Sequence, residues 1–192
     1  MSDSACNQAV DVMSAGRMRE VLLSLAGALY EAHPGRGEIV LVGIQRRGAL
    51  LAAELCRILE RAHGIAVPVG SLDITLYRDD WTTGALKPKI GRTLIPFDVK
   101  GKNLVLVDDV LYTGRTVRAA LDALSDFGRP GRVELLVLVD RGHRELPIHP
   151  DYVGLTLNTA KQDRVDVLVA SLDGEDGVRL APGRDCSDER IG

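Results

Sequence analysis

A strongly apolar run followed by two acids and a glycine-containing turn occupies the middle of the chain, as Leu104-Val105-Leu106-Val107-Asp108-Asp109-Val110-Leu111-Tyr112-Thr113-Gly114-Arg115-Thr116. Its first four residues are typical of a central parallel strand, and the two acids are expected to end that strand. Val117, Leu121 and Leu124 then recur at helical spacing before Gly128. The stretch therefore predicts a strand, a tight turn over residues 113–116 and a helix.

Similar strand and helix patterns lie on both sides of this stretch. Residues 39–42 predict a buried strand, and residues 133–139 predict another. After a turn at residues 43–48, a helical face is carried by Leu51, Leu55, Ile58 and Ala62. Strands that alternate with helices pair in parallel through right-handed crossovers, and ligands bind at the carboxyl ends of such strands. We therefore expect an α/β protein with a mainly parallel central sheet flanked by helices.

The first half of the chain is expected to contribute an arm, a helix, a strand and a loop. Residues 1–15 lack periodicity and predict a loose arm, and an amphipathic helix then ends near His33. Alternation over residues 72–77 predicts a half-exposed strand. Residues 78–92 hold too few apolar side chains to pack into a core, so we expect a mobile loop there.

The end of the chain is expected to complete the same unit. Short strand-like pieces at residues 152–157 and 165–169 are expected to extend the sheet or to cap it, and residues 182–192 are expected to fray. The length of the chain suits one domain with an appendage better than two equal domains. We therefore expect residues 1–192 to form a single domain.

Composition and charge exclude several classes of protein. Of the 192 residues, 45% are apolar and 27% are charged, and no apolar run approaches the length of a bilayer span, so no membrane association is expected. The amino terminus lacks a secretory signal pattern, so we expect a cytoplasmic protein. The net charge of -3 disfavours general nucleic-acid binding. The three cysteines are widely spaced, which indicates neither a disulfide framework nor a zinc site.

The chemistry of residues 108–116 suits a ribose 5-phosphate. Around Gly114, backbone N–H groups can converge at a helix amino terminus, and threonine hydroxyls add donors, which suits a phosphate monoester. Asp108 and Asp109 can accept hydrogen bonds from the vicinal hydroxyls of a sugar. The nucleotide motifs Gly-x-x-x-x-Gly-Lys-Ser/Thr and Gly-x-Gly-x-x-Gly are absent, which disfavours ATP hydrolysis and dinucleotide binding. An acidic strand end that only caps the turn is the structural alternative.

Residues 104–116 resemble the phosphoribosyl pyrophosphate motif of type I phosphoribosyltransferases, and their amino-acid sequence is similar to that of the PyrR family. Residues 41–44, 73–80 and 139–148 match the same family, so the resemblance covers most of residues 39–152. Members of this family are uracil phosphoribosyltransferases, and many also regulate pyrimidine operons by binding messenger RNA. The resemblance implies the type I phosphoribosyltransferase fold, with a small hood and with residues 78–92 as a flexible lid.

The resemblance also implies individual roles. Asp108 and Asp109 would hold the ribose hydroxyls of phosphoribosyl pyrophosphate, and Arg46 and Arg47 would lie in a pyrophosphate loop at residues 45–48. Uracil would lie beside Arg141 and the backbone of Val165. The loop that would complete the phosphoribosyl pyrophosphate site and hold the 5-phosphate contains Val110, Leu111, Tyr112, Thr113, Gly114, Arg115 and Thr116.

The implied reaction depends on charge control more than on a covalent nucleophile. Positive charge grows on the ribose ring while negative charge grows on the leaving pyrophosphate. Arg46, Arg47, Arg78 and a Mg²⁺ ion would neutralise the pyrophosphate, with the metal bound through substrate oxygens and no direct protein ligand assigned. Asp108, Asp109 and Arg78 are thus the catalytic candidates, and UMP and pyrophosphate would be the products.

Alternatives to this function remain open. A non-catalytic, nucleotide-sensing regulator of pyrimidine operons could keep the same fold, and so could a purine phosphoribosyltransferase. For RNA as a partner, Leu23, Gly27 and Leu155 stand where RNA-regulating relatives are expected to carry a hydroxyl, a histidine and a lysine. Because these substitutions remove donors or charge, they weaken the expectation of RNA binding. Relatives commonly dimerise, so the resemblance implies a homo-oligomer.

Overall fold

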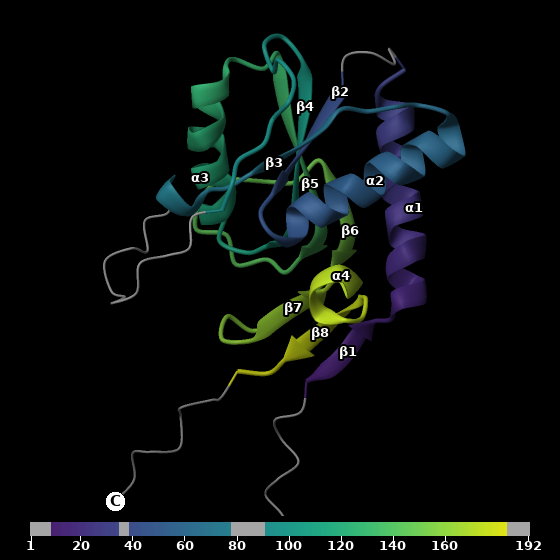
Figure 1. Ribbon diagram of the computed structural model, residues 1–192. Helices are drawn as coiled ribbons and strands as arrows, with labels where there is room; N and C mark the ends of the chain where they lie inside the picture. Colours follow the sequence, from purple (N-terminus) through teal and green to yellow (C-terminus); the bar gives the residue numbers. More distant parts are fainter. Residues whose placement is uncertain (1–8, 35–38, 78–90, 184–192) are drawn as a thin grey trace, which may run out of the picture.

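Two β-sheets organise the residues that the computed structural model describes, which are 9–34, 39–77 and 91–183 (Figure 1). The larger sheet has the strand order β3-β2-β4-β5-β6, and all of its neighbouring strands are parallel. Its strands are β2 (Ile39–Ile44), β3 (Val69–Leu72), β4 (Asn103–Leu111), β5 (Arg132–Asp140) and β6 (Tyr152–Thr156). The predicted α/β architecture with a parallel sheet is confirmed.

Helices cover both faces of this sheet. Helices α1 (Ala15–Ala32) and α2 (Arg47–His63) lie on one face and α3 (Arg115–Leu124) lies on the other (Figure 1). Successive residues of β4 point to opposite faces, so Val105 and Val107 pack under α1 and α2, whereas Leu104 and Leu106 pack under α3. This burial on both sides explains why the strand is a continuous apolar run.

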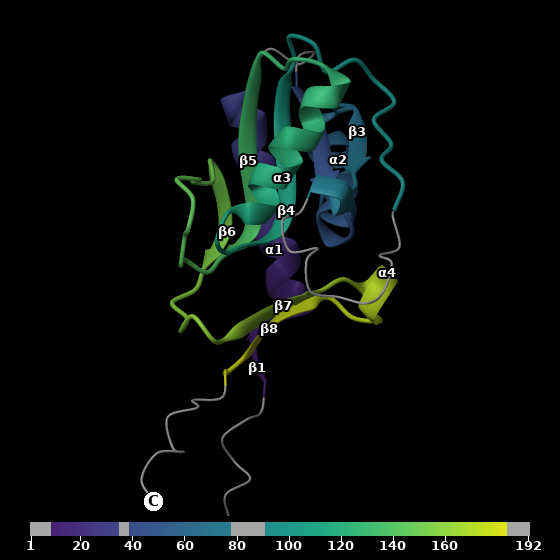
Figure 2. The same ribbon diagram turned by 90° about the vertical axis from the view of Figure 1, so that its left-hand side faces the viewer.

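A second, antiparallel sheet with the order β1-β8-β7 lies beyond the carboxyl ends of β5 and β6 (Figures 1 and 2). Its strands are β1 (Val10–Met13), β7 (Arg164–Leu168) and β8 (Gly177–Ala181), and the short helix α4 (Ala170–Asp173) connects the last two. Val10 pairs with Leu180, so this sheet joins the two ends of the described chain. We call β1, β7, α4 and β8 together the hood.

Three sequence-based expectations about secondary structure are wrong. Residues 1–15 are not all a loose arm, because Val10–Met13 form β1 and Ala15 begins α1. The two acids do not end the central strand, because β4 continues to Leu111 and stays paired with β5 up to Leu111 and Asp140. The predicted helical face of α2 includes Ala62, which is exposed.

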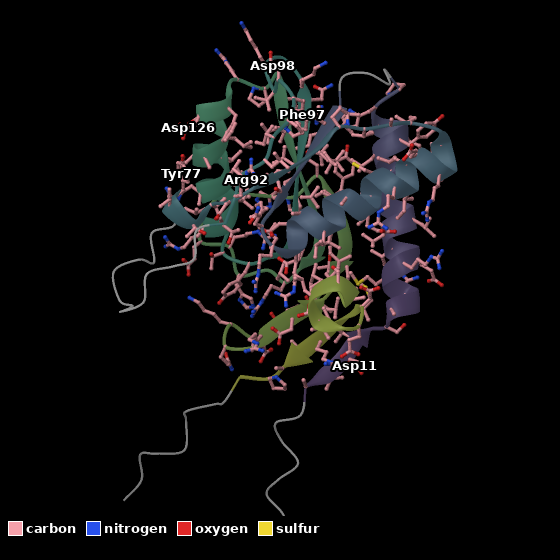
Figure 3. All side chains as sticks on the ribbon, in the orientation of Figure 1. Asp11, Tyr77, Arg92, Phe97, Asp98 and Asp126 are labelled. Carbon is pink, nitrogen blue, oxygen red and sulfur yellow. The ribbon has the colours of Figure 1, made fainter. Side chains whose placement is uncertain are left out.

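The strand predicted at residues 72–77 is also wrong, and its failure has a local cause. Strand β3 ends at Leu72, and a 3-10 helix, η1, covers Thr75–Tyr77. The Asp73 carboxylate accepts a hydrogen bond of 2.8 Å from the backbone N–H of Thr75, which closes a turn where the alternation suggested extended chain. The Tyr77 hydroxyl donates to Asp126, beyond the end of α3, and fixes η1 there (Figure 3).

Several expectations fall wholly or partly outside the described residues. These are the first part of the arm at residues 1–8, most of the expected lid at 78–90, including Arg78, and the tail at 184–192. Of the expected tail, Pro182 and Gly183 are described, and the Gly183 N–H donates to Asp163 at 3.0 Å. None of the helices in the described part of the chain has the length and apolar character needed to cross a bilayer.

Candidate active site

A polar cavity of about 260 Å³ lies at the carboxyl ends of β2, β3 and β4. It brings together both acids and both arginines that the sequence singled out, with Thr116 from the predicted phosphate turn. It also includes Asp73 and Thr75, to which no role had been given. The lining residues are Ile44, Gln45, Arg46, Arg47, Asp73, Ile74, Thr75, Asp108, Asp109, Val110 and Thr116.

The two acids are oriented by their own backbone. Asp108 is 5% exposed and Asp109 is half-buried. Asp108 Oδ1 accepts a hydrogen bond of 3.0 Å from the N–H of Asp109, and Asp109 Oδ1 accepts one of 3.0 Å from the N–H of Val110. Each carboxylate therefore has one oxygen oriented by a backbone N–H, and ionised carboxylates accept hydrogen bonds of the kind that a sugar diol donates.

The turn that follows, residues 112–116, is called the phosphate loop below. Gly114 has φ 91°, a left-handed conformation that glycine adopts without steric cost, and it immediately precedes α3. The Arg115 N–H donates to Thr113 Oγ1 at 3.4 Å. Because the first N–H groups of a helix lack intrahelical acceptors and carry positive potential, the start of α3 can bind an anion.

The phosphate loop is braced by the segment that follows β5, residues 140–148, which we call the brace. The N–H groups of Glu145 and Leu146 donate to the Thr113 carbonyl at 3.0 and 3.2 Å. Arg144 donates to the Tyr112 carbonyl at 2.9 Å and to Asp140 Oδ2 at 2.6 Å. In the sequence this segment resembles a known family, but no role was assigned to Arg144 or Glu145. The signal that could have identified them is the high density of charged residues directly after a strand.

Electrostatics strengthen the brace. Burial raises the pKa of Asp140, but hydrogen bonds from Arg144 and from the Gly142 N–H outweigh it, and the pKa is lowered overall. The Arg115 side chain donates to Glu145 at 2.9 Å and lowers the pKa of that carboxyl group. The Arg115 side chain therefore contacts the brace, and its backbone N–H contacts Thr113 within the phosphate loop.

The predicted pyrophosphate loop, Gln45 to Gly48, lies directly against the acids. Its Gln45–Arg46 peptide bond is cis, and Arg47 begins α2. A Cβ on Gly48 would lie 2.4 Å from the Val107 carbonyl oxygen and 3.1 Å from the Cα of Asp108. Only glycine allows this close approach, and it places the Arg46-Arg47 pair beside the carboxylates of β4.

The described end of the segment expected as a lid lies next to the pyrophosphate loop (Figure 3). Gln45 Nε2 donates to the Arg92 carbonyl at 2.6 Å, and the Asp73 N–H donates to Thr93 Oγ1 at 3.0 Å. Asp73 Oδ2 is buried and has no hydrogen-bond partner among the described residues. Asp73 and Gln45 therefore connect the carboxyl end of the expected lid to the cavity.

The two residues predicted beside uracil lie outside this cavity. Arg141 is 6% exposed, and its guanidinium donates to the carbonyls of Asp163 at 2.7 Å and Ala160 at 2.9 Å. It also lies 4.2 Å from the centre of the Tyr112 ring, in a cation–π contact. Val165 is 9% exposed and packs in the core from β7. The Arg141 side chain thus orders residues 159–163 next to the phosphate loop.

A metal ion would need ligands beyond those that the described residues supply in one place. Within residues 9–34, 39–77 and 91–183, no three His, Cys, Asp or Glu side chains form a group that could hold a metal ion. The cavity nevertheless offers oxygen donors from Asp73, Asp108 and Asp109, which are of the type that Mg²⁺ prefers. The donor set fits an ion that shares oxygens with a bound phosphorylated substrate.

Comparisons with known proteins agree with this geometry. A family model described as "Phosphoribosyl transferase domain" matches residues 17–171. The chain is 54% identical over 170 residues to "Bifunctional protein PyrR" of Thermus aquaticus, covering 88% of this chain and 94% of that protein. It is 51% identical over 171 residues to "Bifunctional protein PyrR" of Nostoc punctiforme, with 89% and 96% covered.

Solved structures extend the likeness to the fold. A hypoxanthine phosphoribosyltransferase from Staphylococcus aureus superimposes with a TM-score of 0.66 at 18% identity, over 96% of this chain and 98% of that one. At this identity the likeness concerns the fold alone, and it confirms the predicted type I phosphoribosyltransferase fold. Together with the family model and the close relatives, it leads to one conclusion: the chain belongs to the PyrR family of phosphoribosyltransferases.

Proposed function

We propose that this protein transfers ribose 5-phosphate from phosphoribosyl pyrophosphate to uracil, with UMP and pyrophosphate as products. The observation that carries the proposal is the cavity in which Asp108 and Asp109 lie between the Arg46-Arg47 loop and the start of α3. The donor substrate has three polar parts in the same order: a pyrophosphate, a vicinal diol and a terminal phosphate. Each part meets a group of complementary charge or hydrogen-bonding type.

The proposed reaction forms a bond from N1 of uracil to C1 of ribose while the bond from C1 to the pyrophosphate oxygen breaks, and the proton of N1 is released to solvent. The ribose becomes cationic as it loses pyrophosphate, and the carboxylates of Asp108 and Asp109 stabilise that charge through the ribose hydroxyls. Arg46 and Arg47 bind the negative charge that develops on the leaving group. Arg78 lies outside the described residues, and it is a catalytic candidate by resemblance alone.

Magnesium belongs to the same proposal. Bound through the pyrophosphate and ribose oxygens, the ion would add positive charge at the leaving group. Asp108 and Asp109 would hold it indirectly, through the bound substrate. Removal of Mg²⁺ with a chelator is expected to abolish turnover and to weaken binding of phosphoribosyl pyrophosphate.

The uracil side of the proposal depends on the loop that Arg141 orders. Residues 159–163 lie against the Tyr112 ring through the Arg141 guanidinium, and Tyr112 begins the phosphate loop. His143, in the brace, is tied to the same loop through a 2.7 Å contact between Nε2 and the Thr159 carbonyl. A planar base that approaches ribose at this edge would meet an ordered backbone, and uracil is recognised through such N–H and C=O groups.

The test is a discharge assay with phosphoribosyl pyrophosphate, Mg²⁺ and each free base in turn. We expect nucleotide with uracil and no product above background with hypoxanthine, guanine or adenine. Product with a purine base alone would overturn the choice of uracil. Binding of nucleotide without turnover of any base would instead support a non-catalytic, nucleotide-sensing regulator.

A second activity is favoured by the name of the relatives, "Bifunctional protein PyrR". Many members of this family also regulate pyrimidine operons by binding messenger RNA. Leu23 is 48% exposed on α1, so the apolar substitution noted in the sequence does lie on the surface. Filter binding to a pyrimidine-operon leader RNA at two salt concentrations tests this activity, since phosphate contacts give a steep salt dependence.

The remaining parts of the proposal concern the whole protein. We propose that residues 1–192 act as a single phosphoribosyltransferase domain, that the protein works in the cytoplasm, and that it forms a homo-oligomer. Sedimentation equilibrium tests the oligomer, and cell fractionation tests the location. A monomer at micromolar concentration, or recovery in a membrane or secreted fraction, would contradict the corresponding part.

A further inference from the structure

One contact ties the hood directly to the cavity. The Arg47 guanidinium donates two hydrogen bonds to the Asp173 carboxylate, from Nη2 to Oδ1 at 2.9 Å and from Nε to Oδ2 at 3.3 Å. Arg47 begins α2 and lines the cavity, whereas Asp173 ends α4 in the hood, 126 residues later. This parallel pair of bonds fixes the plane of the guanidinium and not only its distance.

Asp173 is also held in place by contacts other than the one with Arg47. Its Oδ2 accepts a hydrogen bond of 2.9 Å from the Val169 N–H, and its own N–H donates to the Val169 carbonyl at 2.8 Å. The bond from the Val169 N–H lowers the pKa of Asp173, and the bond from Arg47 lowers it further. The group is therefore a fixed anion at neutral pH, and its side chain is only 20% exposed.

The contact leaves Arg47 able to bind a second anion. A guanidinium has five N–H donors, and the bonds to Asp173 engage one on Nε and one on Nη2. The remaining donors can face an anion in the cavity that Arg47 lines. Arginine loses considerable rotamer freedom when it binds, so a partner that fixes the side chain in advance reduces that cost.

We propose that Asp173 is a positioning residue for Arg47 and holds its guanidinium ready for the pyrophosphate group of the donor substrate. The inference rests on the proposed function in one respect, because it takes the cavity to be the pyrophosphate site. It adds a residue from the hood to the binding machinery and makes the affinity for pyrophosphate depend on the order of α4.

The test compares two carboxylates of the hood: Asp173, the last residue of α4, and Asp176, which lies between α4 and β8. Asp173→Asn removes the charge that holds Arg47, whereas Asp176→Asn alters a carboxylate that accepts from the Ala170 N–H at 2.7 Å and, within the described chain, has no hydrogen bond to Arg47. Calorimetric titration with Mg²⁺-pyrophosphate, Mg²⁺-phosphoribosyl pyrophosphate and UMP measures the effect. For Asp173→Asn we expect about tenfold weaker binding of the first two ligands and unchanged binding of UMP. For Asp176→Asn we expect all three affinities to stay within about twofold.

A double-mutant cycle shows whether Asp173 acts through Arg47. Arg46 remains in the Arg47→Ala protein, so pyrophosphate binding should be weakened but measurable. In that background Asp173→Asn should have no further effect, and in the wild-type background Asp173→Glu should restore part of the affinity. Equal effects of Asp173→Asn and Asp176→Asn would overturn the inference, and so would a full effect of Asp173→Asn in the Arg47→Ala protein.

Failure of the inference can be told apart from failure of the proposed function. If the wild-type protein binds pyrophosphate and loses affinity on Asp173→Asn but does not turn over uracil, only the proposed function fails. If it turns over uracil and Asp173→Asn has no effect on binding, only the inference fails. If it binds neither pyrophosphate nor phosphoribosyl pyrophosphate, both are overturned.

Discussion

The parallel sheet takes its five strands from residues 39–156, whereas the hood joins Val10–Met13 to strands that begin at Arg164. In the parallel sheet, the acids and the phosphate loop lie within nine consecutive residues, 108–116, on one strand, turn and helix. In the hood, the contacts that matter span the chain: Arg47 with Asp173, and Arg179 with Asp11, which are 126 and 168 residues apart.

The comparison separates the part of the molecule that is proposed to recognise the substrate from the part that can adjust the affinity for it. The residues proposed to contact the sugar and the phosphate lie in one local segment, on a sheet that is buried on both faces. The hood contacts depend on long-range docking and on surface ion pairs, which are weaker and more sensitive to solvent. Changes in the local segment should therefore affect chemistry, and changes in the hood should affect affinity.

The sharpest test of the local segment is Asp109→Asn. The substitution keeps the size of the side chain and removes the charge, so stabilisation of the cationic ribose is lost. We expect kcat for UMP formation to fall by about 100- to 1000-fold, with the melting temperature nearly unchanged. Asp122→Asn, on the surface of α3 where Asp122 pairs with Arg118, is the matched control and should retain full activity. A decrease in kcat of less than about threefold would show that Asp109 does not take part in the reaction.

Gly48→Ala tests whether the pyrophosphate loop must lie against β4. The added Cβ would lie 2.4 Å from the Val107 carbonyl oxygen, so the start of α2 must shift away from the acids. We expect a loss of about 1–3 kcal/mol in the free energy of unfolding and weaker binding of phosphoribosyl pyrophosphate. Gly27→Ala in α1 is the control, because a Cβ there meets nothing within 4 Å. Thermal denaturation that ranks the two variants equally would contradict the close approach.

These two regions also differ in how far the sequence predicts them. The strand, the acids and the turn at Gly114 were predictable because one short segment carries the apolar run, the charges and the glycine. The strand predicted at residues 72–77 failed because the Asp73 side chain closes a turn that alternation alone does not reveal. Asp173 could not be predicted, because its contact with Arg47 forms only when the hood packs against the start of α2. Strand β1 could not be predicted either, because its partner β8 lies near the other end of the described chain.

Arg141 lies between the two regions, and its replacement should weaken the binding of uracil alone. Arg141→Ala removes the donors to the carbonyls of Asp163 and Ala160 and the contact with Tyr112, so residues 159–163 lose their order. We expect the KM for uracil to rise about tenfold with little change in the KM for phosphoribosyl pyrophosphate. Arg164→Ala, which removes an exposed ion pair with Asp166, is the control and should change neither constant. Equal increases in both constants would indicate a general loss of structure.

The smallest expected effect is the pH dependence of the segment next to the hood, and Asp163, the residue before β7, reports it. Hydrogen bonds from the N–H groups of Gly183, at 3.0 Å, and Ala160, at 2.7 Å, lower the pKa of this carboxyl group from its ordinary value of 3.8. A lowered folded-state pKa means that the group contributes its full stability above pH 3.8 and loses it as the pH falls through the lowered value.

The contacts of Asp163 with Ala160 and Gly183, at the edge of the hood, should therefore loosen in acid. In NMR titrations, the amide signals of Ala160 and Gly183 should shift with a midpoint below 3.8, while that of Leu138 in β5 stays constant over the same range. Asp163→Asn should abolish the shift at both amides. A midpoint at or above 3.8 would mean that these hydrogen bonds do not hold the carboxylate, and the contrast between a fixed sheet and an adjustable hood would lose this support.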